Sequence, residues 1–165
     1  MKIIDISIPK GAIFSNDRKY RYALWRIWSS YKPFMLSIGL NPSTAGAFND
    51  DPTITRDIVR ANRLGFGGLF KANLYGYVST DPKELLKDGN YVGGLNDYYL
   101  REMIKITACH LVCWGSFPPV TKRAPIVLEM IPEPVCLAIN KDGQPKHSLY
   151  VAYAVPFGKY EGVSQ

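Results

Sequence analysis

The sequence predicts an α/β fold, a three-layer α/β/α sandwich around a mostly parallel, four-stranded central sheet. Apolar runs of strand length alternate strictly with segments of helical periodicity through the body of the chain. This pattern is typical of parallel strands joined by right-handed crossovers. The 165 residues suit a single domain, and 47% of them are hydrophobic, so the chain can bury a core without a disulfide or metal staple.

The first 30 residues are predicted to form a hairpin-like extension of this core. Two extended segments between residues 11 and 28 flank the turn pair Asn16-Asp17. We favour an amphipathic hairpin, or a hairpin leading into a helix, with its arginines solvated; the alternative is a basic, aromatic edge that tracks phosphates. The basic and aromatic residues concerned are Arg18, Lys19, Tyr20, Arg21, Tyr22, Trp25, Arg26 and Trp28.

The first strand and helix of the core have clear sequence boundaries. Residues 35–40 form an apolar run that predicts a buried strand. Asp51 is a good N-cap and Pro52 suits the first helical position, so a helix is expected over residues 52–64. Gly65 ends that helix as a C-cap.

The alternation continues to the end of the core at residue 151. Residues 69–75 form the second strand, and Asp81 or Thr80 caps a short helix that begins at Pro82. The elements expected after it are a helix at 96–106, a strand at 110–114, a helix at 124–130, a strand at 135–139, a turn at 141–145 and an irregular tail at 152–165.

Polar side chains follow each predicted core strand. Asn41 and Ser116 follow apolar runs, Asn73 lies near the carboxyl end of the second strand, and His147 follows the turn after the last strand. Because the carboxyl ends of parallel strands share one edge of the sheet, we expect these four residues to converge there. Ligands of open α/β sheets bind at this edge.

Three residues at this edge have side chains suited to catalysis. Asn41 could orient a water molecule, or it could hold its own loop as a turn residue. A neutral His147 could donate a hydrogen bond to a developing oxyanion; a surface histidine or a phosphate contact is the alternative. Asp50 could act as a general base or magnesium ligand, whereas the adjacent Asp51 is better explained as the helix cap.

The same edge could hold a nucleobase. The amide of Asn73 suits the Watson–Crick edge of a pyrimidine, although it could instead satisfy loop backbone. Phe48 could stack on a base or pack against its own loop. The expected substrate-binding residues are Pro42, Ser43, Thr44, Phe48, Asn73, Tyr75 and Ser116.

The formal net charge of +6 favours a polyanionic partner, because the summed positive field attracts phosphates. We expect DNA as this partner, contacted by Lys71, Arg123 and Lys146.

The cysteines and the missing motifs exclude several classes. Cys109, Cys113 and Cys136 lie in apolar contexts without a Cys-x-x-Cys pair, which predicts buried free thiols and no metal or other cofactor. No Walker loop, G-x-G-x-x-G, G-x-S-x-G or H-E-x-x-H motif supports a known route of nucleotide hydrolysis. Without an apolar run of membrane length or a signal peptide, we expect a cytoplasmic protein, and no obligate protein partner is evident.

Several short motifs occur in the order of a known family. They are Leu40-Asn41-Pro42-Ser43-Thr44-Ala45, Asp50-Asp51-Pro52-Thr53-Ile54, Gly65-x-Gly67-Gly68, Asn73-Leu74, Thr80-Asp81-Pro82, Trp114-Gly115 and Asp142-Gly143-Gln144-Pro145-x-His147. With them the chain resembles domain of unknown function 1643, a bacterial and phage family without an established activity. The sequence departs from the family at Ser148, where proline is usual.

The Gly-x-Asn-Pro motif at residues 39–42 and the later Asn and His are also similar to the uracil-DNA glycosylase superfamily. The resemblance implies a glycosylase-like fold. It also implies that Asn41 positions the attacking water, Asn73 reads a flipped base, and His147 contacts the base oxygen or the DNA backbone. A wedge residue follows in that superfamily, which implies Leu149 or Tyr150 here.

The expected function is therefore a DNA glycosylase that hydrolyses the N-glycosidic bond of a flipped modified or damaged base, in defence against modified phage DNA or in repair. One alternative is a nucleotide- or base-modifying enzyme of phage type. Another is a nucleic-acid-binding module without catalysis, in which Asn41 and His147 serve only their loops.

Overall fold

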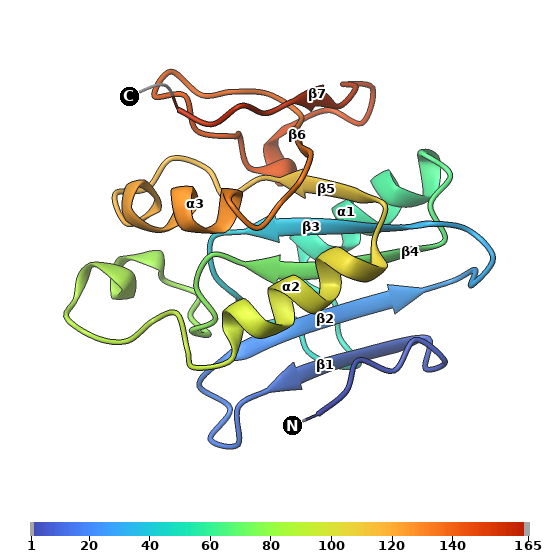
Figure 1. Cartoon of the computed structure of the whole chain (residues 1–165), viewed down its shortest axis with the longest axis horizontal. Coiled ribbons are helices and arrows are strands. Elements are labelled where there is room, and N and C mark those ends of the chain that lie inside the picture. Colours follow the sequence, from blue (N-terminus) through green and yellow to red (C-terminus); the bar gives the residue numbers. More distant parts are fainter. Residues whose placement is uncertain (1, 164–165) are drawn as a thin grey trace.

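The computed structural model describes residues 2–163, which form one mixed seven-stranded sheet with three helices and two short 3₁₀ helices (Figure 1). The strands lie in the order β1-β2-β4-β3-β5-β6-β7. The elements are β1 (Lys10–Phe14), β2 (Arg21–Ile27), β3 (Phe34–Gly39), α1 (Pro52–Arg63), β4 (Gly68–Asn73), η1 (Pro82–Leu86), α2 (Asn96–Ile106), β5 (Cys109–Val112), α3 (Val120–Leu128), β6 (Pro134–Cys136), η2 (Ser148–Tyr150) and β7 (Gly158–Lys159).

The centre of the sheet is parallel, as the alternation predicts, but its edges are not. β4, β3, β5 and β6 are parallel neighbours, whereas β1-β2, β2-β4 and β6-β7 pair antiparallel. The prediction of a four-stranded sheet with a separate amino-terminal extension is wrong in this respect. β2 joins the sheet beside β4 because nearly its whole length is buried.

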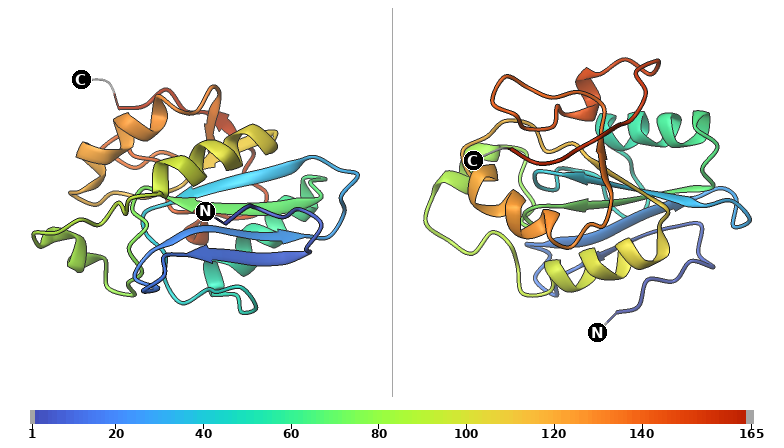
Figure 2. Two further views of the ribbon diagram at one scale, coloured as in Figure 1. Left: turned by 60° about the horizontal axis from the view of Figure 1, so that its bottom comes forward. Right: turned by 45° about the horizontal axis from the view of Figure 1, so that its top comes forward.

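Helices cover both faces of the sheet, as Figure 2 shows. One apolar cluster joins the sheet to α2 and α3, with Leu100 and Val127 among its buried members. A second cluster joins the opposite face to α1 and the chain after η2, through Ile54, Ala61 and Val151. These two cores hold the carboxyl ends of the parallel strands in place between them.

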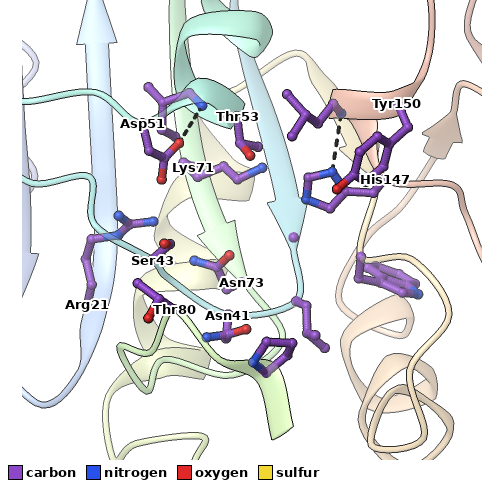
Figure 3. Close-up of a pocket in the computed structure, with 16 residues that line it drawn as sticks. Arg21, Asn41, Ser43, Asp51, Thr53, Lys71, Asn73, Thr80, His147 and Tyr150 are labelled. Atoms are coloured by element: carbon purple, nitrogen blue, oxygen red, sulfur yellow. Dashed lines mark hydrogen bonds between the residues drawn. The ribbon is translucent and has the colours of Figure 1, made fainter. Parts of the chain in front are cut away.

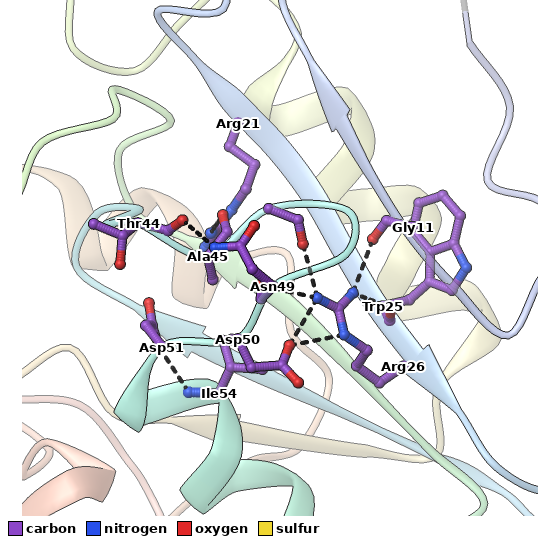
Figure 4. Close-up of polar contacts among 11 residues, drawn as sticks. Gly11, Arg21, Trp25, Arg26, Thr44, Ala45, Asn49, Asp50, Asp51 and Ile54 are labelled. Carbon is purple, nitrogen blue, oxygen red and sulfur yellow. Dashed lines mark hydrogen bonds and ion pairs between the residues drawn. The ribbon is translucent and has the colours of Figure 1, made fainter.

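The interpretation of solvated arginines on the amino-terminal hairpin is wrong for two of them. Arg21 and Arg26 on β2 are only 3% and 7% exposed. The loop between β3 and α1 covers them, and Arg26 binds Asp50 and the Gly46 carbonyl at 2.7 Å each (Figure 4). Because β2 lies inside the sheet, its polar side chains must find partners within the protein.

The carboxyl-terminal elements differ most from their predicted bounds. α3 begins at Val120, four residues before the predicted start at 124, because the Val120 N–H already donates to the Phe117 carbonyl at 2.9 Å. The predicted tail is partly regular, since β7 pairs with β6 and Tyr160 is buried against Trp114. Residues 164–165 of that tail lie outside the described residues.

The predicted cap of α1 is confirmed, and it gives a stability prediction. The Asp51 carboxylate accepts from the Ile54 N–H at 2.9 Å, with Pro52 in the first helical position. We expect Asp51→Ala to lower the free energy of unfolding by about 1 kcal/mol, and Asp51→Asn to change it little because asparagine also caps. Urea titrations monitored by circular dichroism test this; equal losses in both variants would contradict a capping role.

Candidate functional site

A cavity of about 380 Å³ lies at the carboxyl ends of β3 and β4 (Figure 3). We call it the edge cavity. Its lining comes from β2, the end of β3 and the β3–α1 loop, the start of α1, β4, the chain leading into η1, Trp114 two residues past β5, and η2 with the residue before it. The residues labelled in Figure 3 are Arg21, Asn41, Ser43, Asp51, Thr53, Lys71, Asn73, Thr80, His147 and Tyr150.

The structure brings three of the four expected edge residues together. Asn41, Asn73 and His147 all line the edge cavity, together with Ser43, and Leu149 and Tyr150 lie beside them. Ser116 does not reach it. Its exposed hydroxyl donates to Asp142 at 2.7 Å and accepts from the side chain of Asn140.

Several other expected site residues lie outside the edge cavity. The expected catalytic Asp50 faces Arg26, and the Tyr75 hydroxyl donates to the Pro119 carbonyl at 2.8 Å. Phe48 is 81% exposed, so it packs against little of its own loop. Pro42 and Thr44 contribute carbonyls that hold the loop, accepting from Ser79 N–H and from the Asn49 amide.

Two expected DNA contacts are not on the surface. Lys71 is 4% exposed and pairs with Asp57, and Arg123 is 5% exposed and pairs with Asp97. The expectation that they grip phosphates is therefore corrected: both cations are already neutralised within the fold. Lys146 is exposed, as a phosphate contact requires.

The floor of the edge cavity is open because residue 39 is glycine. A Cβ at Gly39 would lie 3.0 Å from Asn73 Oδ1 and 3.4 Å from Lys71 Nζ. Asn73 is 3% exposed, yet its side chain makes no hydrogen bond to any of residues 2–163. Its amide atoms are not fully enclosed and line the edge cavity, so a ligand there can form hydrogen bonds with them.

The amide of Asn41 is oriented by its own loop. Its Nδ2 donates to the carbonyls of Ser79 at 2.9 Å, Pro42 at 3.1 Å and Tyr77 at 3.4 Å. These bonds hold the loop, as the structural alternative predicts. They also fix the amide plane and leave Oδ1 as the atom able to accept a hydrogen bond in the cavity.

His147 has a defined tautomer and charge. Its Nδ1 accepts from the Leu149 N–H at 3.3 Å, so in the neutral ring the proton is on Nε2. Burial, together with the nearby Lys71 ammonium, lowers the pKa of His147, although Asp57 and Asp51 oppose the shift. A neutral imidazole that donates from Nε2 is the form suited to an oxyanion.

The lowered pKa of His147 predicts a pH effect on stability. Below about pH 6.5 the unfolded chain binds this proton more readily than the folded one, so stability is present above that pH and falls as the solution becomes more acidic. We expect His147→Gln to lose less stability than the wild type between pH 7.5 and pH 5.5, measured by urea titration. Parallel losses in the two proteins would contradict this.

A buried ion pair lies under the floor. Lys71 Nζ is 3.0 Å from Asp57 Oδ2 and 2.8 Å from Ser37 Oγ, and Ser37 donates to the same carboxylate oxygen at 2.8 Å. Burial opposes both charges and is the largest single effect, but the attraction between them and the surrounding hydrogen bonds and charges together outweigh it. The pKa of Lys71 is therefore raised and that of Asp57 lowered. Lys71 is thus an ammonium at neutral pH.

Arg21 and Asp51 were not among the expected ligand-binding residues. Because β2 runs antiparallel to β4, its first residue lies at the edge where β4 ends, and the Arg21 N–H donates to the Gly76 carbonyl at 2.8 Å. Burial lowers the pKa of Arg21 to about 10, with Asp51 opposing and Arg26 adding to the shift. Arg21 thus stays cationic at neutral pH.

No group of three or more His, Cys, Asp or Glu side chains within residues 2–163 could hold a metal ion. Cys109, Cys113 and Cys136 are free thiols, as predicted, although Cys109 is only partly buried. None of the helices in the described part of the chain is long and apolar enough to cross a membrane.

The protein is of the α/β class, and its polar cavity lies at the carboxyl edge of a partly parallel sheet, where ligands of open α/β sheets bind. Residues 21–149 match the family described as "Protein of unknown function (DUF1643)". The chain belongs to this family, as its motif order indicates. No curated protein and no solved structure matched the chain, so the comparisons give no support to the resemblance to uracil-DNA glycosylases.

Proposed function

We propose that the protein hydrolyses the N-glycosidic bond of an extrahelical base in DNA, with a modified or damaged pyrimidine as the base. The observation that carries the proposal is the pair of asparagines in the edge cavity. Asn41 has an oriented amide oxygen, and the Asn73 amide lines the cavity without a hydrogen bond to any of residues 2–163. The first suits a water molecule and the second suits a base edge. A three-layer fold of glycosylase type is part of this proposal.

The reaction needs little from the protein beyond orientation and charge. The water oxygen bonds to the sugar C1′ while the bond from C1′ to the base nitrogen breaks. The base leaves with the electron pair of that bond, and one proton of the water ends on the departing base anion. Asn41 Oδ1 would hold the water, and the His147 Nε2–H would stabilise the departing anion. Because an amide is a weak base, such a site favours labile bases over normal ones.

The size of the cavity agrees with this substrate. About 380 Å³ is within the range of small-molecule sites and accommodates one flipped nucleotide. Tyr150 is 72% exposed beside the cavity, and Leu149 lines it, so either side chain could fill the space that the base leaves in the duplex. The net charge of +6 supports binding to the phosphate backbone.

Base release from a panel of DNAs tests the proposal. The panel contains unmodified, uracil-containing and mismatched duplexes and phage DNA with modified pyrimidines, and mass spectrometry detects the freed base. Release with an alkali-labile abasic site is the expected result. No release from any DNA by folded protein overturns the proposal. Salt-sensitive DNA binding alone would then favour a binding module, and binding of free nucleotides would favour a nucleotide-modifying enzyme.

A further inference from the structure

The guanidinium of Arg21 is the least satisfied buried charge in the edge cavity. Arg21 is 3% exposed, and its one side-chain hydrogen bond runs from Nη1 to the Ala45 carbonyl at 2.6 Å (Figure 4). Its Nε is buried without a hydrogen-bond partner, and Nη2, which also has none among residues 2–163, is not fully enclosed and can reach the cavity. Arg26, five residues further along β2, instead donates hydrogen bonds from all three guanidinium nitrogens.

A buried N–H donor without an acceptor raises the free energy of the folded protein. A guanidinium has five N–H donors, and a buried charged donor without a partner loses its hydration with no return. The two nearby carboxylates do not accept hydrogen bonds from the free donors of Arg21. Asp51 raises the pKa of Arg21 but lies beyond ion-pair distance, and Asp50 is taken by Arg26. A structural role for Arg21 would therefore account for Nη1 alone.

The surroundings of Arg21 suggest what would complete it. Figure 3 shows Arg21, Ser43 and Asn73 around one end of the edge cavity. The charged groups that face the cavity are Arg21, Lys71 and Asp51, and Asp57 already neutralises Lys71 from below. Arg21 is thus the cation that remains open to a ligand.

We infer that Arg21 binds an anionic oxygen group, a phosphate or a carboxylate, on the same ligand whose base Asn73 contacts. The inference rests on the cavity's proposed role as a nucleotide site, and it makes Arg21 a specificity-determining residue. Guanidinium groups match the geometry of phosphate and carboxylate oxygens, and such charge-assisted bonds are roughly twice as strong as neutral ones. The ligand is then an acidic nucleotide or a base that carries a carboxylate, and not a bare neutral base.

Matched pairs of small ligands test this inference and separate the two sources of charge. Calorimetry at constant ionic strength compares deoxyuridine monophosphate with deoxyuridine for the phosphate, and orotate with uracil for the carboxylate. In one pair we expect the acidic member to bind roughly 10- to 100-fold more tightly. Arg21→Gln should abolish that preference, Arg21→Lys should keep part of it, and Arg101→Gln, which removes an exposed charge from α2, should leave it intact.

The outcomes are distinct. Equal binding within both pairs, or a preference that survives in folded Arg21→Gln protein, overturns the inference. If Arg21→Gln does not fold, the Nε–H signal of Arg21 in labelled wild-type protein decides: it must shift with the acidic member of the pair and not with the neutral one. Anion binding through Arg21 without base release from DNA would support this inference and reject the glycosylase activity. Base release without a preference for the acidic ligands would support the glycosylase activity and reject this inference.

Discussion

Replacing Asp57 with asparagine is expected to lower the free energy of unfolding by about 3–5 kcal/mol, the usual loss when one partner of a buried ion pair is removed. Asp57 is fully buried, and its Oδ2 accepts from both Lys71 and Ser37. The neutral amide would leave the ammonium in the core without a counter-charge. Urea unfolding at pH 7, followed by tryptophan fluorescence, measures the loss.

Two control variants separate charge from packing. The double variant Asp57→Leu with Lys71→Met removes both charges and should recover most of the stability, because apolar side chains can replace a buried pair. Glu102→Gln breaks an exposed pair with Lys105 and should change little, because water screens it. A loss below about 1 kcal/mol in Asp57→Asn would show that Lys71 can lose its proton or reach water instead.

The alternation of apolar runs and helical segments is enough to predict the parallel centre of the sheet. Each strand and helix there is specified locally, by an apolar period and by caps such as Asp51, and the bounds of α2 at Asn96–Ile106 agree with the prediction. From these elements the crossover rule predicts a shared carboxyl edge. That is why Asn41, Asn73 and His147 could be expected together from residues far apart in the sequence.

The placement of β2 could not be predicted in the same way. An extended, aromatic segment indicates a strand, but its period does not say which strand it joins or in which direction. The antiparallel pairing with β4 is what carries Arg21 to the edge cavity and buries Arg26. Arg21 reaches the cavity only through the pairing of strands that are far apart in the sequence, so no pattern around residue 21 predicts its place there.

The buried ion pair did leave a signal in the sequence. Lys71 interrupts a strand that is otherwise apolar, and Asp57 lies three residues after Ile54 and four before Ala61, on the buried side of α1. A charge on an apolar face is seldom fully buried unless it is paired. Pairing one such acid with one such base would have placed Lys71 in the core and not on a DNA-binding surface.

Replacing Asn41 with alanine is expected to reduce base release by roughly 100-fold or more, the scale of losing one positioned group that acts in the transition state. DNA affinity should change little, because the phosphate contacts lie elsewhere. The variant removes Oδ1, the acceptor proposed to hold the attacking water, and also the Nδ2 bonds to Ser79 and Pro42. Single-turnover release, with affinity measured separately, gives both quantities.

A second asparagine in the same loop provides the control that separates the loss of Oδ1 from the loss of the Nδ2 hydrogen bonds. Asn49 anchors the same loop, through Nδ2 to the Thr44 carbonyl at 2.8 Å, but does not line the edge cavity. Asn49→Ala should therefore loosen the loop and retain base release. If both variants lose release equally, Asn41 acts by holding the loop, and the water must be positioned by another group. A selective loss in Asn41→Ala, with binding preserved, would assign the amide oxygen to the chemical step.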